Sequence, residues 1–147
     1  MPGLKNYRAF GQQLKTGDIR HIEQIIQLLE DEEHRPGYAV FKQNIWSYLK
    51  KAHLNEQQKR RLRNAVLGYL NRRMTRDFWA MAKFIGTIAT DELRSRVQEL
   101  AQGSDRQIRT RALLLSGYLE GPESGAQARQ EFRSKVLDEK YGWKGNW

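Results

Sequence analysis

The stretch FWAMAKFIGTIA, residues 78–89, decides the fold of this 147-residue chain. Phe78, Met81 and Ile85 recur at steps of three and four residues, which predicts an α-helix. Trp79 lies off that stripe, so the segment is apolar on most of its circumference. A helix that is hydrophobic all round is buried. We therefore expect residues 78–89 to form a helix in the middle of the core.

Seven further stripes of apolar residues at helical spacing lie on either side of this segment. No segment shows the two-residue alternation of a β-strand. We therefore predict an all-α protein of about eight helices, joined by short turns into a compact multi-helix bundle or a short helical solenoid. The seven stripes begin at Leu4, Ile19, Tyr38, Leu62, Leu93, Ile108 and Phe132.

Side chains that can cap helix N-termini stand before five of these stripes. Their oxygens can accept hydrogen bonds from the free amides of a first helical turn. Asn55 also has Gln58 three residues later, the spacing of a capping box. The predicted N-caps are Thr16, Asn55, Thr75, Thr90 and Ser104.

One predicted helix carries a family resemblance. Residues 105–119 read DRQIRTRALLLSGYL, with an acidic start at Asp105, an apolar–Arg pair at Ile108 and Arg109, and Gly117 near the end. This pattern resembles the second helix of a HEAT-like α-helical repeat, so the resemblance implies a short HEAT-like solenoid. It also implies a binding scaffold, without specifying a ligand.

The composition predicts a soluble, cytoplasmic protein. There is no cysteine, which excludes disulfides and thiol nucleophiles and is typical of a reducing compartment. The opening sequence MPGLKNYRAFGQQLK lacks the apolar stretch of a signal peptide, and no apolar run is long enough to span a bilayer, so we expect no membrane insertion. We predict one helical domain over residues 1–140 and a Lys/aromatic tail over residues 141–147.

The formal net charge of +9 is concentrated in one segment. Residues 50–76 hold nine cations against Glu56 alone, a net charge of +8, whereas residues 16–35 carry a net charge of −4. Like charges four residues apart on a helix repel one another, so a face of one sign calls for a compensating partner. The nine candidate polyanion-binding residues are Lys50, Lys51, Lys59, Arg60, Arg61, Arg63, Arg72, Arg73 and Arg76.

Two compensating partners remain open for this basic segment. One is internal, the acidic segment of residues 18–33 packed beside it. The other is an external polyanion, nucleic acid first, because cations that neutralise phosphates release counterions, which dominates non-specific nucleic-acid binding. On a helical wheel Arg60, Arg61 and Arg72 fall on the solvent-facing arc, so we expect their replacement to leave stability almost unchanged.

The tail of residues 141–147 interleaves aromatic residues with lysine and glycine. Three interpretations remain open: the aromatics fold back onto the core, they dock in a partner's groove, or they stack on bases. The candidate docking or stacking residues are Tyr141, Trp143 and Trp147.

No pattern in the sequence indicates catalysis. The three histidines lie far apart without ligand-spaced partners, and we find neither a Gly-rich phosphate loop nor a Ser/His/Asp arrangement. We predict a non-catalytic binding module without metal or cofactor, which holds a polyanion with low sequence specificity because phosphate contacts carry no base information. The alternative is a protein–protein interaction adaptor or scaffold, steered by its charges to a partner or to a second copy of the chain.

Overall fold

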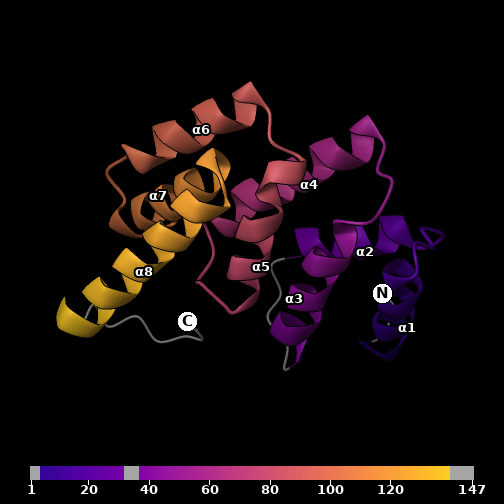
Figure 1. Ribbon diagram of the computed structural model, residues 1–147. Helices are drawn as coiled ribbons and strands as arrows, with labels where there is room; N and C mark the ends of the chain where they lie inside the picture. The colour runs from indigo at the N-terminus through magenta and orange to yellow at the C-terminus, as the bar shows by residue number, and fades with distance from the viewer. Residues whose placement is uncertain (1–3, 32–36, 140–147) are drawn as a thin grey trace.

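The computed structural model describes residues 4–31 and 37–139, and within these residues every regular element is helical (Figure 1). The described residues form eight α-helices, which confirms the all-α prediction and its number of helices. Their bounds are α1 Leu4–Lys15, α2 Ile22–Glu30, α3 Tyr38–Leu49, α4 Glu56–Tyr69, α5 Asp77–Phe84, α6 Asp91–Ala101, α7 Arg106–Glu120 and α8 Pro122–Glu139.

Helix α5 joins the two halves of the molecule. It packs against α3 on one side and contacts α7 and α8 on the other (Figure 1). In the N-terminal half α1 also packs against α3, and α2 packs against α4; in the C-terminal half α7 packs against both α6 and α8. The apolar stretch that begins at Phe78 therefore forms the central helix, as predicted.

Burial of α5 confirms this position. Phe78, Trp79 and Phe84 expose 1%, 4% and 0% of their surface. The predicted helix over residues 78–89 is wrong in one respect, because the α-helix ends at Phe84 and Ile85–Thr87 continues as a single 3₁₀ turn. Gly and Thr are poor helix formers, and they occupy the last two positions of that turn.

Two of the five predicted N-caps are confirmed. Asn55 and Gln58 form a reciprocal capping box at the start of α4, and the Thr90 hydroxyl oxygen accepts a hydrogen bond from the Leu93 amide at 3.1 Å at the start of α6. These bonds satisfy amides that a helix leaves without an internal partner.

The other three predicted N-caps are wrong. Asp105, rather than Ser104, caps α7 by accepting hydrogen bonds from two backbone amides. The hydroxyl of Thr75 instead donates to the carboxylate of Asp77, and that of Thr16 donates to a carbonyl in the last turn of α1. Short polar side chains bond locally in several ways, so residue type alone does not fix the helix start. The HEAT-like resemblance of residues 105–119 stays a prediction.

Candidate functional site

Arg61 lies in an internal ion-pair cluster. Its guanidinium pairs with Glu30 of α2, with Nη2 and Oε1 2.6 Å apart, and also with Glu23, which lies two turns earlier on the same face of that helix. The hydrogen bond to Glu30 is the largest cause that raises the pKa of Arg61 above its usual value. For this residue the internal partner proposed from the sequence is confirmed: the acidic segment compensates the basic one.

Arg72 also binds α2, through the backbone. Its Nη2 donates to the carbonyl oxygens of Leu29 at 3.3 Å and Glu30 at 3.2 Å, at the end of that helix. A cation at a helix C-terminus is favourable, because the last carbonyls lack partners within the helix. The guanidinium also lies 4.5 Å from the centre of the Tyr69 ring. The expectation that Arg61 and Arg72 face only solvent is therefore wrong, since a helical wheel does not show that α2 covers this side of α4.

Arg63 is similarly engaged inside the fold. Its side chain is 13% exposed, pairs with Glu56, and donates to the carbonyl oxygen of Ile88 at 3.1 Å. Three further candidate cations lie exposed or half-buried near the ends of α3 and α4: Lys51, Lys59 and Arg73.

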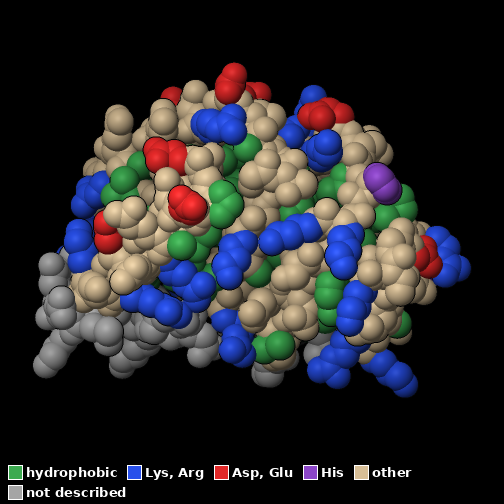
Figure 2. Space-filling model, in the orientation of Figure 1, with side chains coloured by type: hydrophobic (Ala, Val, Ile, Leu, Met, Phe, Trp, Pro, Cys, Tyr) green, Lys and Arg blue, Asp and Glu red, His purple; other side chains and the backbone are tan. Residues whose placement is uncertain are grey.

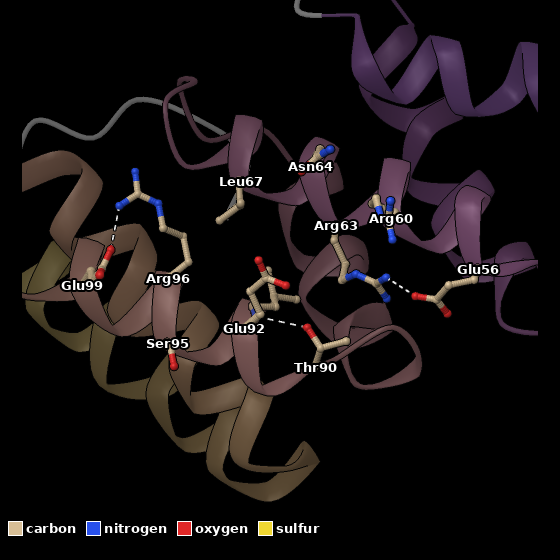
Figure 3. A pocket seen from close by; sticks show the side chains of 11 residues that line it. Glu56, Arg60, Arg63, Asn64, Leu67, Thr90, Glu92, Ser95, Arg96 and Glu99 are labelled. Atoms are coloured by element: carbon tan, nitrogen blue, oxygen red, sulfur yellow. Dashed lines mark hydrogen bonds and ion pairs between the residues drawn. The ribbon is translucent and has the colours of Figure 1, made fainter.

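Arg60 lines a groove of about 960 Å³ between α4 and α6 (Figure 3). Charges of both signs line this groove in equal number, and several of them pair with one another; Arg96 and Glu99, for example, are 2.8 Å apart. A polyanion would meet three carboxylates here, so the groove does not favour one. Its charged lining residues are Glu56, Arg60, Arg63, Glu92, Arg96 and Glu99.

A second groove, which we call the cationic groove, lies between α3, α5 and α8 and has a volume of about 310 Å³. Basic side chains gather over these three helices across the lower half of the face in Figure 2. None of the described residues that line this groove is acidic. Its lining consists of Gln43, Ser47, Lys50, Arg76, Trp79, Ala80, Lys83 and Arg129.

Helical spacing brings the lining residues of α3 and α5 together. Ser47 and Lys50 follow Gln43 by four and seven residues, which places all three on one face of α3 and its C-cap. Arg76 and Lys83 have the same seven-residue separation across α5. The two faces meet because α3 packs against α5, and α8 closes the third side of the groove.

The cations of this groove lack carboxylate partners. In the described part of the chain, none of Lys50, Arg76, Lys83 and Arg129 forms an ion pair. Burial is the main cause that lowers the pKa of the Arg129 guanidinium, and the nearby charge of Arg133 lowers it further. An arginine remains charged under these conditions, so its environment favours a nearby negative charge.

Two side chains that line this groove each hold a nitrogen atom buried without a hydrogen-bond acceptor among residues 4–31 and 37–139: Nε1 of Trp79 and Nε of Arg129. The two side chains also contact one another, with the guanidinium 4.5 Å from the centre of the indole ring. Buried donors are nearly always paired in folded proteins, so two unpaired donors lining one groove indicate a place for an acceptor.

The sequence predicted two of the four groove cations, Lys50 and Arg76, and missed Lys83 and Arg129. The missed signal for Lys83 was its place seven residues after Arg76, which puts the two cations on one face of the helix. For Arg129 the sequence carries no such signal, because its place beside α5 depends on how α8 packs.

The described residues form neither a metal site nor a membrane span. Among the described residues no three His, Asp or Glu side chains gather closely enough to hold a metal ion, and no helix is long and apolar enough to cross a membrane. The predicted docking residues Tyr141, Trp143 and Trp147 lie outside the described residues.

Comparison of the chain with protein-family models, curated protein sequences and solved structures finds no match.

Proposed function

We propose that this protein is a non-catalytic binding module that holds the phosphate backbone of nucleic acid in the cationic groove. The observation that carries the proposal is the convergence of Lys50, Arg76, Lys83 and Arg129 on one groove without an acidic lining residue. Four cations that have no carboxylate partner among the described residues are suited to phosphates, whose binding releases counterions.

The local context of Arg76 supports the same proposal. Arg76 stands at the N-cap of α5, where a positive charge is unfavourable with respect to the helix dipole. Asp77 in the first turn offsets this cost, but it is buried and hydrogen-bonded to Tyr69 and Thr75. Helix stability therefore does not account for Arg76, whereas an anion in the groove does.

The size of the groove bears on the kind of contact. A volume of about 310 Å³ is at the lower end of the range for small-molecule sites. The groove therefore suits a short single-stranded segment rather than a length of duplex. Contacts to phosphate and sugar position a nucleic acid without reading its bases, so we expect low sequence specificity.

Binding of a labelled single-stranded oligonucleotide of mixed sequence, followed by fluorescence anisotropy between about 50 and 200 mM salt, tests this proposal. Four neutralised phosphates give a slope of about −3 for the logarithm of affinity against the logarithm of salt concentration. Combining Lys50→Gln, Arg76→Gln and Lys83→Gln leaves one groove cation, so the slope should flatten to about −1.

A variant with the same net charge serves as the control. Lys5→Gln, Lys15→Gln and Arg94→Gln remove three exposed cations from α1 and α6, outside the groove. This triple variant should keep most of the affinity and the slope of the unaltered protein. Absence of binding at low salt, or an equal loss in both triple variants, would rule out a groove-specific site and leave only the general effect of net charge.

The α4/α6 groove supports a protein partner as the second candidate function. It is larger, its charges balance, and Leu67 and Leu93 add apolar surface. Such a lining suits a polypeptide of mixed charge rather than a phosphate chain. Arg60→Glu combined with Arg96→Glu should abolish capture of a partner from nuclease-treated lysate while oligonucleotide binding is retained; the opposite pattern would rule out this role.

A further inference from the structure

The surroundings of Trp79 limit what its side chain can do in the cationic groove. Arg129 covers the ring, Phe78 meets it edge-on at 5.4 Å between ring centres, and Phe132 lies 6.0 Å away. Only 4% of Trp79 is exposed. The ring is therefore not free to stack on a base, which is the usual role of an aromatic residue in a single-strand binding site.

What Trp79 retains is its N–H group. Nε1 is a donor only, and it lies buried without an acceptor among the described residues, like Nε of Arg129. Leaving a buried donor unpaired is unfavourable, because the group has lost its hydrogen bonds to water. Since Trp79 and Arg129 are in contact and line the same groove, one small acceptor group with several oxygens can serve both donors.

We infer that Trp79 and Arg129 form a subsite for a single phosphate group within the cationic groove. The indole N–H and the guanidinium Nε–H each donate to an oxygen of that phosphate, while Lys50, Arg76 and Lys83 supply the surrounding positive charge. Hydrogen bonds to a charged acceptor are stronger than those between neutral groups. This inference rests on the proposed function, because it specifies how the same groove holds a phosphate.

A second tryptophan provides an internal control. Trp46 is fully buried against the same central helix, but its Nε1 donates to the Tyr69 hydroxyl at 3.2 Å. Its ring lies 5.3 Å from Phe84 and does not line the cationic groove. Trp46 and Trp79 are thus two buried indoles that differ in whether the N–H has a partner.

Titration with inorganic phosphate, followed through the indole N–H signals in a ¹H–¹⁵N NMR spectrum, tests the subsite directly. Chloride is exchanged for phosphate at constant ionic strength, so general screening stays the same. The Trp79 signal, assigned with Trp79→Phe, should move downfield and saturate, whereas the Trp46 signal should stay in place. Equal movement of both signals, or a shift that does not saturate, would overturn the subsite.

Matched variants extend the test to the oligonucleotide. Trp79→Phe removes the N–H and should weaken binding by about tenfold, the lower end of the range for a hydrogen bond to a charged group. Trp46→Phe should leave the affinity unchanged, provided that circular dichroism shows both variants folded. Arg129→Lys keeps the charge but lacks the Nε–H group and should weaken binding by a similar factor, whereas Arg94→Lys on α6 should not.

The outcomes separate the subsite from the proposed function. If the oligonucleotide binds with the expected salt slope but Trp79→Phe and Arg129→Lys bind as tightly as the unaltered protein, the groove holds phosphates through charge alone and the subsite is wrong. If the unaltered protein does not bind the oligonucleotide at low salt, the proposed function itself fails. If phosphate shifts the Trp79 signal and both variants lose affinity, the subsite is supported.

Discussion

Two arginine side chains of this protein lie over aromatic rings at the same separation, with opposite surroundings. Arg72 lies 4.5 Å from the centre of the Tyr69 ring, and Arg129 lies 4.5 Å from that of Trp79. In the first pair Arg72 donates to two carbonyl oxygens of α2, and the Tyr69 hydroxyl donates to Asp77 at 2.6 Å. In the second pair Nε of Arg129 and the indole N–H lack acceptors within the described residues.

The comparison shows why an arginine on an aromatic ring does not by itself mark a binding site. The Arg72 pair holds α4 to α2, so most of its polar groups are bonded within the fold, although Nε of Arg72 has no acceptor among the described residues. The Arg129 pair lines a groove whose other cations have no carboxylate partners in the described chain. The two pairs differ in whether their polar groups have partners in the fold. Substitutions in the Arg72 pair should therefore lower stability, and substitutions in the Arg129 pair should lower binding.

The change that should cost the most stability disturbs α5, the helix that supports both the Arg72–Tyr69 pair and the Arg129–Trp79 pair. Asp77, Phe78 and Trp79 are consecutive at the start of α5, so one helix places the acceptor for Tyr69 and the ring beneath Arg129. Phe78→Ala should lower the free energy of unfolding by about 3–5 kcal/mol, the range for emptying a buried aromatic site. Denaturation with urea measures this loss.

An exposed residue on another helix provides the control. Leu113 on α7 is 56% exposed, so Leu113→Ala should change the free energy of unfolding by about 0.5 kcal/mol or less. A loss of less than about 1 kcal/mol for Phe78→Ala would show that α5 does not support the two pairs jointly.

The sequence predicted the helices well and the site only in part, for physical reasons that differ. Apolar periodicity follows directly from helix geometry, so the stripe through Phe78 revealed a buried helix without knowledge of its neighbours. The place of a charged side chain depends on which helix lies opposite. The helical wheel predicts that Arg61 faces solvent, but it meets α2, whereas Arg129 comes from a helix far along the chain and completes the groove.

Replacing each arginine by glutamine separates its effect on folding from its effect on binding. Arg72→Gln loses the hydrogen bonds to the end of α2 and should lower the free energy of unfolding by about 2 kcal/mol, because these bonds involve a charged donor. Arg129→Gln loses its contact with Trp79 and its interaction with Tyr118, and it should cost about 1 kcal/mol. Oligonucleotide affinity should fall for Arg129→Gln and stay unchanged for Arg72→Gln.

Urea denaturation measures the free energy of unfolding of the two variants, and fluorescence anisotropy measures their affinity for the oligonucleotide. The expected result is a crossed pattern, in which one arginine matters more for folding and the other for binding. If Arg72→Gln loses affinity to the same extent as Arg129→Gln, the division between a structural pair and a binding pair does not hold.

Stability should also depend on pH through the Arg72–Tyr69 pair, and this change is the smallest that we expect. Burial is the main cause that raises the pKa of Tyr69 well above its ordinary value of about 10, and the charge of Asp77 adds to it. The folded state therefore keeps the tyrosine protonated where the unfolded state loses the proton. The stability that this contributes is complete well below pH 10 and is lost as the pH rises past 10, at a rate that approaches about 1.4 kcal/mol per pH unit.

Tyr69→Phe isolates this contribution, because phenylalanine does not titrate and all other groups stay the same. We expect the unaltered protein to be more stable than the variant at pH 8, since the hydroxyl bonds both Asp77 and the indole N–H of Trp46. Between pH 10 and 11 that advantage should shrink by about 1 kcal/mol, measured by urea denaturation at each pH. An advantage that stays constant to pH 11 would mean that the Tyr69 hydroxyl ionises as readily in the folded protein as in the unfolded one. The first pair would then be open to solvent, and its contrast with the groove pair would have to rest on Arg72 alone.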